Sequence, residues 1–281
     1  MINIDKELHE FDFIRNYTDL HNFVISMLSG INHSIYYVFV DEVQEIEQWE
    51  KAINSFLAEK KYDIYITGSN ARFLSSELAT LLSCRYVEFQ LHTLCFSEFS
   101  ELYSLKNSEK GLDKNFLFNE FIKYGGFPGL HNLEWEETVL RQYLQSVYDT
   151  IILKDIIMRN KVRDVAMLQR IFIFLADNCG NITTAKNISD YVKSQHLKIA
   201  PETVQNYIQF AIDAYMLNQA RRYDVKGERL LELHEKYYLG YIGLLYALSG
   251  FEPDKISYRF ENIVIYEILS LGYHVKVGKI A

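Results

Sequence analysis

One run of residues constrains the fold of this chain more than any other feature. Residues 36–40, Tyr-Tyr-Val-Phe-Val, lead directly into Asp41 and Glu42. The five aromatic and β-branched side chains do not alternate with polar ones, which predicts a strand buried on both faces of a parallel sheet. The two carboxylates would then follow the carboxyl end of that strand, where open α/β sheets bind ligands. The pattern leaves open the alternative that the acids only mark where a core strand reaches solvent.

A second strand is predicted at Ile64–Thr67, and residues 46–58 between the two strands carry apolar side chains at helical spacing. The order strand, helix, strand indicates a right-handed crossover between parallel neighbours. The second strand runs into Ser69 and Asn70. These polar side chains are therefore expected on the same edge of the sheet as the two acids.

Two adjacent acids at such an edge are typical of sites that hydrolyse nucleoside triphosphates. The first carboxylate holds Mg²⁺, usually through water, and the second orients or deprotonates the attacking water. Asp41 and Glu42 fit these two roles, so both are candidate catalytic residues, and Asp41 is also the candidate metal and cofactor ligand. Asn70 is the candidate catalytic sensor of the γ-phosphate, and Ser69 is a candidate cofactor-binding hydroxyl.

Several short segments stand in order along almost the whole chain. They are Val38–Gln44, Trp49, Ile66–Ala71, Leu81–Ser83, Arg85–Glu88, Phe96–Phe99, Tyr124–Gly129, Lys236–Leu239 and Glu261–Asn262. Together they resemble the prokaryotic AAA+-class P-loop ATPases that carry a C-terminal domain of unknown function. The resemblance implies ATP and Mg²⁺ as cofactors, ATP hydrolysis as the activity, and Arg85 as a candidate catalytic arginine finger. A glycine precedes this arginine in the family, whereas Cys84 precedes it here.

The family's phosphate-binding loop ends in Gly-Lys-Ser/Thr, and none of the 13 glycines of this chain lies in that pattern. By the order of the family the loop would precede Ile2–Ile4, so we expect it upstream of Met1, in a chain that begins late. Without the strand that carries the loop, the predicted fifth strand Tyr86–Phe89 would lack a ladder partner. On this view the chain alone binds ATP weakly, and it self-associates or needs the missing amino-terminal segment.

Two further modules are predicted toward the carboxyl end. Short helices at 188–193 and from Pro201, followed by a hairpin over 217–230, indicate a winged helix-turn-helix. A helix at 258–269 and a strand at 273–277 resemble the start of the family's nuclease-like domain. Glu261 matches an acidic residue of that domain, but an ordinary capping or solvated acid is the favoured interpretation here.

DNA is a candidate partner of the winged helix. The polar face of its second helix and the hairpin supply the candidate contacts, which are Thr203, Gln205, Asn206, Gln209, Arg221 and Arg222. Residues 165–235 carry as many acidic as basic side chains. Neutralisation of phosphate is then weak, so a role in packing between domains is favoured over DNA binding.

The composition of the chain excludes several classes of protein. The net charge of −8 argues against a protein whose whole surface binds nucleic acid. The cysteines show no Cys-x-x-Cys spacing, which argues against a disulfide framework or a zinc site. The sequence has no leader with a charged start and an apolar core, and no apolar run of membrane-spanning length, so a cytoplasmic protein without membrane contact is predicted.

The predicted fold class is α/β: a partial P-loop ATPase sheet, then a mostly α winged-helix module and an incomplete nuclease-like α/β end. The expected domains are a partial AAA+ core at 1–110, a helical connector at 111–160, the winged helix at 161–235 and the nuclease-like start at 236–281. Two functions stay open, an AAA+-like ATPase and a winged-helix regulatory or scaffold module without catalysis.

Overall fold

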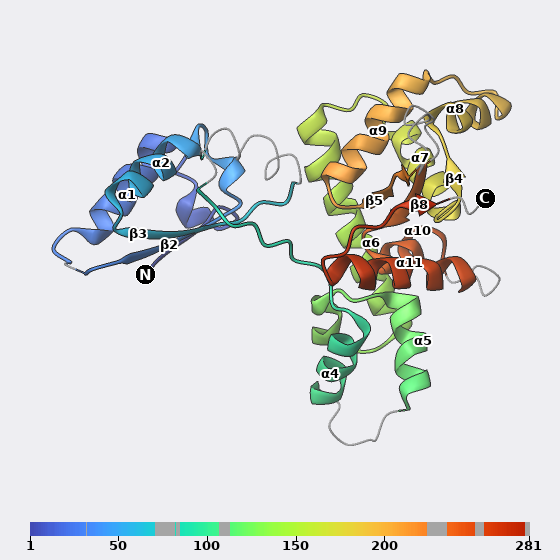
Figure 1. The fold of residues 1–281 in the computed structure, drawn as a ribbon, viewed down its shortest axis with the longest axis horizontal. Coiled ribbons are helices and arrows are strands. Elements are labelled where there is room, and N and C mark those ends of the chain that lie inside the picture. The colour runs from blue at the N-terminus through green and yellow to red at the C-terminus, as the bar shows by residue number, and fades with distance from the viewer. Residues whose placement is uncertain are drawn as a thin grey trace. The chain divides into compact units, whose positions relative to one another are not determined.

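The structure is a computed structural model that describes residues 1–31, 33–70, 82, 85–106, 113–223, 235–250 and 256–278. The chain divides into two compact units, Met1–Phe89 and Gln90–Ala281, whose elements are labelled in Figure 1. None of the helices in the described part is long and apolar enough to cross a membrane.

The first unit is built on a parallel sheet of three strands in the order β1–β2–β3. Its strands are β1 (Ile2–Asp5), β2 (Tyr36–Asp41) and β3 (Tyr62–Ile66). Its helices are η1 (His9–Phe11), α1 (Tyr17–Leu28), η2 (Val43–Glu45) and α2 (Trp49–Glu59). The register pairs Val40 with Ile4 on one side and with Ile66 on the other, so the carboxyl ends of the strands lie at one edge.

Helices α1 and α2 cover one face of this sheet. Val38 and Val40 of β2 are buried in one cluster with residues of both helices, including Val24 and Phe56. Helix α1 starts at Asn16, which forms a capping box with Asp19, and this box satisfies amides that the helix itself leaves unpaired.

The prediction that β2 is buried on both faces is wrong for the described residues. Tyr37 of β2 and Tyr65 of β3 are 45% and 48% exposed, and the rings of Phe39 and Tyr65 stack with their centroids 4.7 Å apart. The run lacks polar residues because its second face is aromatic. Stacked aromatic rings can bury part of their area against one another without a covering helix.

The second unit is mostly helical. In chain order its helices are α4 (Phe96–Lys106), α5 (Lys114–Tyr124), η4 (Pro128–Asn132), α6 (Glu137–Thr150), the π-helix η5 (Ile151–Met158), α7 (Val165–Asp177), α8 (Ala185–Ser194), α9 (Pro201–Asp213), α10 (Ile242–Ser249) and α11 (Ile256–Ser270). The strands β4 (Ile182–Thr183), β5 (Leu217–Ala220) and β7 (Glu235–Leu239) form a small antiparallel sheet in the order β4–β7–β5.

Local sequence signals explain where several of these helices begin. Pro201 occupies the first turn of α9, as predicted, where a missing amide costs no hydrogen bond. Asp164 and Thr184 cap α7 and α8 through their side-chain oxygens. The apolar faces of α7, α8 and α9 meet in the largest buried cluster of the unit.

Two predicted strands are corrected by the structure. Residues Tyr86–Phe89 form neither helix nor strand, and Val87 and Phe89 are 79% and 81% exposed. The strand predicted at 273–277 is reduced to β8 (Val277–Gly278), which pairs in parallel with β6 (Arg222–Tyr223). In both places the residues favour a strand, but a strand also needs a neighbour that supplies its hydrogen bonds.

The segment that opens the second unit is fixed to α11 and to the glycine-rich loop. The amide and hydroxyl of Thr93 both donate to the Tyr266 hydroxyl, at 2.7 and 3.0 Å, and the Phe96 amide donates to Glu267 Oε1 at 2.8 Å. The Leu94 amide donates to the Gly126 carbonyl at 2.8 Å. A Cβ on Gly126 would lie 2.0 Å from the Leu94 carbonyl oxygen, so close backbone packing explains this glycine.

His131 of η4 is buried among aromatic rings. It is 6% exposed, and its ring centroid lies 4.8 Å from that of Phe99 and 5.6 Å from that of Trp135. Burial lowers the pKa of His131 below its ordinary value, and the charge of Lys106 lowers it further. The neutral imidazole is therefore the form that the folded protein favours.

Stability should fall with acidity because of this histidine. Below about pH 6.5 the unfolded imidazole binds a proton that the folded one resists, so the free energy of unfolding decreases as the pH drops through that range. Urea midpoints measured from Trp135 fluorescence in a Trp49→Phe background should decline less steeply with acid in His131→Phe. The slope should not vanish, since burial also lowers the pKa of His92. An unchanged slope would contradict the prediction.

Candidate functional site

The predicted acids and the polar residues after β3 lie at one edge of the first unit's sheet. Strand β2 ends at Asp41 and β3 at Ile66. The backbone ladder continues one step further, because the Thr67 amide donates to the Val40 carbonyl at 3.0 Å and the Val43 amide donates to the Thr67 carbonyl at 3.1 Å. These bonds fix the chain after β3 beside the two acids.

Thr67 holds the carboxylate of Asp41. Its hydroxyl donates to Asp41 Oδ1 and accepts the Glu42 amide at 3.1 Å. The same amide lies 3.2 Å from Asp41 Oδ1. The orientation of Asp41 is therefore set by a residue from the neighbouring strand's end. The sequence pattern identifies Thr67 only as the last residue of the predicted strand. Its hydroxyl could have been recognised as a partner of Asp41, because the two residues end neighbouring parallel strands.

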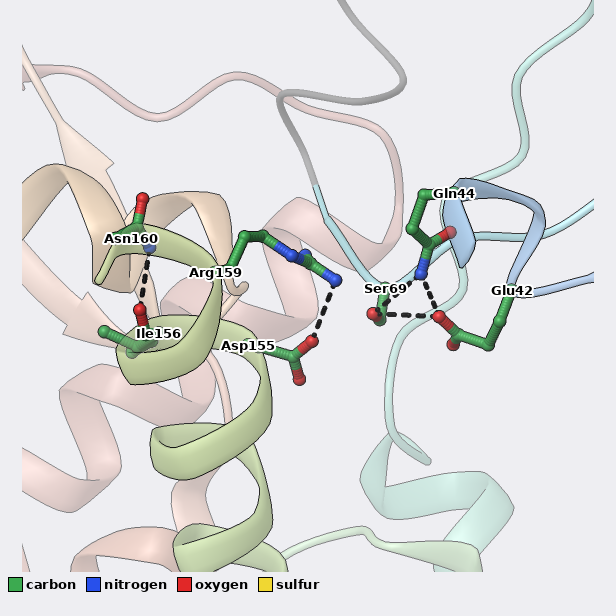
Figure 2. A network of polar contacts seen from close by, with 7 residues as sticks. All are labelled: Glu42, Gln44, Ser69, Asp155, Ile156, Arg159 and Asn160. Carbon is green, nitrogen blue, oxygen red and sulfur yellow. Dashed lines mark hydrogen bonds and ion pairs between the residues drawn. The ribbon is translucent and has the colours of Figure 1, made fainter. Parts of the chain in front are cut away.

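Glu42 has an unusual backbone and a side chain held by two donors. Its φ and ψ are both 48°, in the left-handed region, which costs a non-glycine residue on the order of 1 kcal/mol or more and concentrates at functional sites. Gln44 Nε2 donates to Glu42 Oε2, and Ser69 Oγ donates to the same oxygen at 3.2 Å. Figure 2 shows these three side chains converging.

Two other predicted residues of the ATPase site, Asn70 and Arg85, lie in different surroundings. Asn70 directly follows Ser69 and is 6% exposed. Arg85 is exposed, lies outside any helix or strand, and makes no side-chain hydrogen bond or ion pair with the rest of the described chain. Cys84 and residues 71–81 lie outside the described residues.

Glu261 of α11 is held by strand β7. Lys236 Nζ lies 3.1 Å from Glu261 Oε1, and the Tyr238 hydroxyl donates to the same oxygen at 2.9 Å. In the described residues no group of three His, Cys, Asp or Glu side chains is arranged to hold a metal. The contacts of Glu261 join α11 to β7, while its side chain stays 42% exposed to solvent.

The candidate DNA contacts lie on α9 and after β5. Asn206 is exposed on α9, whereas Thr203, Gln205 and Gln209 are half-buried, and Gln209 donates to Asp213 Oδ1 at 2.8 Å. Arg221 is exposed, and its Nε donates to Gln219 Oε1 at 3.2 Å. The side chain of Arg222 and residues 224–234 of the predicted wing lie outside the described part.

An ion pair lies at the end of the π-helix η5, between Asp155 within it and Arg159 directly after it. Arg159 Nη2 lies 3.3 Å from Asp155 Oδ1, one helical turn earlier, and Asn160 Nδ2 donates to the Ile156 carbonyl at 3.0 Å, as Figure 2 shows. The sequence pattern predicts only packing residues here. Ile152 and Ile156 are indeed buried, but the charged pair was missed.

A parallel sheet with two adjacent acids at its carboxyl edge is typical of AAA-type ATPase domains, and comparison with known proteins supports this class. Residues 1–100 match the model of an AAA domain, and residues 115–255 match a domain of unknown function (DUF8612). A solved structure, the Walker-type ATPase of Pyrococcus abyssi, shares the fold with a TM-score of 0.57 at 13% identity, over 88% of this chain and 83% of that one.

Two relatives are similar in sequence to this chain over most of its length. An uncharacterized protein of Haemophilus influenzae is 33% identical over 280 residues, which cover 100% of this chain and 69% of the relative. An uncharacterized protein of Methanocaldococcus jannaschii is 26% identical over 247 residues, covering 84% of this chain and 53% of the relative. This chain belongs to the family of P-loop ATPases that combine an AAA domain with DUF8612.

Proposed function

We propose that this chain supplies the magnesium-binding and water-orienting side of an ATP-hydrolysing site. The observation that carries the proposal is the network at the edge of the sheet, in which Thr67 holds Asp41 while Gln44 and Ser69 hold Glu42. Two neighbouring carboxylates with separate, fixed orientations fit two separate tasks in one reaction.

The donor set suits magnesium. Carboxylate and hydroxyl oxygens are the hard ligands that Mg²⁺ prefers, and the ion commonly keeps several waters. Asp41 would hold the ion, which supplies charge neutralisation of the phosphates, and Glu42 would orient the attacking water. Asn70 would contact the γ-phosphate, with Ser69 beside it. Arg85 would serve as a finger only toward a neighbouring molecule.

The phosphates themselves need a second set of contacts. A glycine-rich loop of backbone amides normally cradles them, and the 281 residues contain no Gly-x-x-x-x-Gly-Lys-Ser/Thr pattern. We therefore propose that turnover requires such a loop from outside these residues. The extended protein denotes this chain joined at its amino terminus to a segment that carries such a loop.

Two measurements test the proposed function. Calorimetric titration of the 281-residue chain with Mg-ATP should show no binding in the micromolar range, because carboxylates without a phosphate cradle give little affinity for an anion. The extended protein should bind Mg-ATP and release phosphate. Micromolar binding by the 281-residue chain would contradict the first expectation, and an extended protein without binding or turnover would contradict the ATPase proposal.

Binding of duplex DNA by the second unit is the alternative function. The proposal is supported by the element order α7, β4, α8, α9, β5 and β7, which is typical of a winged helix-turn-helix, and by the exposed side chains of Asn206 and Arg221. We expect little retention of DNA at physiological salt, because acids and bases are balanced over this module. A salt-dependent mobility shift that disappears in an Arg221→Ala, Arg222→Ala double variant would establish DNA binding instead.

A further inference from the structure

The carboxylate of Glu42 is held by Gln44, which has no assigned task, and by Ser69, the candidate cofactor-binding hydroxyl. Gln44 belongs to η2, two residues after Glu42, and Ser69 follows the neighbouring strand β3. Both donate to one oxygen, Oε2, and Gln44 Nε2 also lies 3.5 Å from Ser69 Oγ. Two donors on one carboxylate oxygen fix the plane of the group as well as its position.

The orientation of the Gln44 amide shows that it serves Glu42. Among the described residues the buried Gln44 Oε1 has no hydrogen-bond partner, which costs roughly 1–3 kcal/mol. Turning the amide over would relieve that oxygen only by placing it against the Glu42 carboxylate, where two acceptors repel each other. The contact with Glu42 therefore dictates which way the amide points.

The backbone at Glu42 leads to the same conclusion. Its left-handed conformation persists only where surrounding contacts over-determine it. The amide of Glu42 is tied to Thr67, and the side chain is tied to Gln44 and Ser69. One residue is thereby fixed at both its backbone and its side chain, chiefly by the segment that follows β3.

We propose that Gln44 is a positioning residue which, together with Ser69, orients the Glu42 carboxylate before any nucleotide is bound. Through Ser69 the orientation of Glu42 also depends on the segment that follows β3 and includes Asn70, so a displacement of that segment by the γ-phosphate would change the position of the Glu42 carboxylate. This consequence for catalysis rests on the proposed ATPase function. The contact itself does not.

The contact can be tested without nucleotide in the 281-residue chain. Side-chain amides labelled with ¹⁵N at glutamine report hydrogen bonding to a carboxylate, and Gln44→Glu assigns the signal. The Gln44 amide protons should shift as pH is lowered through the titration of Glu42, and Glu42→Gln should abolish the shift. Ser69→Ala should reduce it. Exposed Gln195, whose side chain makes no hydrogen bond with the described residues, is the matched control.

A Gln44 signal that behaves like that of Gln195, in a chain whose backbone spectrum shows an intact fold, would overturn the proposal. The catalytic consequence is measured in the extended protein, where Gln44→Ala should lower kcat about tenfold with KM within about twofold, as expected for a group that acts on the transition state. Full kcat in Gln44→Ala would overturn the positioning role. If the extended protein has no turnover, the proposed function fails, while the amide signal still decides the contact.

Discussion

Replacement of Glu42 by glutamine should abolish most ATP turnover in the extended protein. Glutamine keeps the size and hydrogen-bonding reach of the side chain but loses the charge that orients and polarises water, so kcat should fall on the order of 10²–10³-fold. The affinity for Mg-ATP should change little, because Glu42 is not assigned a contact with the phosphates. Phosphate release and calorimetric titration, measured side by side, separate the two quantities.

The neighbouring acid Glu45 provides a matched control. It also belongs to η2 and is exposed, so Glu45→Gln removes one charge from the same short helix without touching the network. Turnover in that variant should remain within about twofold of the parent, since exposed charges contribute little. Equal activity of Glu42→Gln and the parent would remove Glu42 from the mechanism. A parallel loss in Glu45→Gln would point to an effect of net charge alone.

The largest loss of stability is expected from Asn262→Ala in α11. Asn262 is 4% exposed, and its Oδ1 accepts the Leu239 amide at 2.7 Å while its Nδ2 donates to the Leu239 carbonyl at 3.0 Å. The Asn262 side chain thus forms, with the backbone of Leu239, the two hydrogen bonds that a neighbouring strand would otherwise form at the end of β7. Its loss leaves two buried backbone groups unpaired, which should cost roughly 2–6 kcal/mol at about 1–3 kcal/mol for each.

Urea denaturation followed through Trp135, in the Trp49→Phe background, measures this cost for the second unit. Asn187→Ala is the control, because Asn187 is exposed on α8 and makes no side-chain hydrogen bond with the described residues. That variant should stay within about 0.5 kcal/mol of the parent. An Asn262→Ala midpoint equal to that of Asn187→Ala would show that water replaces the lost contacts and that the site is open to solvent.

The acids at the edge of the sheet could be predicted from sequence because a strand has one carboxyl end, and Asp41 and Glu42 follow it directly. Parallel order and the position of Ser69 followed from the crossover between β2 and β3. Thr67 and Gln44 were not assigned roles, since their contacts depend on register and on the left-handed turn at Glu42. Neither quantity can be read from residue types.

The errors have a common physical origin. Tyr86–Phe89 and residues 273–277 have the composition of strands, but pairing is a property of two segments and composition describes only one. The prediction that β2 is buried on both faces was wrong for a related reason. Phe39 stacks on Tyr65 of the neighbouring strand and is not covered by a helix. The start of α9 at Pro201 was predicted correctly, because the signal that marks it lies within the helix itself.

The attachment of Thr93 to Tyr266 decides how the two units should be separated for expression on their own. Residues 92–96 open the second unit, where Thr93 and Phe96 form hydrogen bonds with α11 and Phe96 begins α4. A second-unit fragment that begins at Phe96 would strip Tyr266 of its hydroxyl partner and expose its ring. A second-unit fragment should therefore begin at Gln90, so that it keeps Thr93 together with α11.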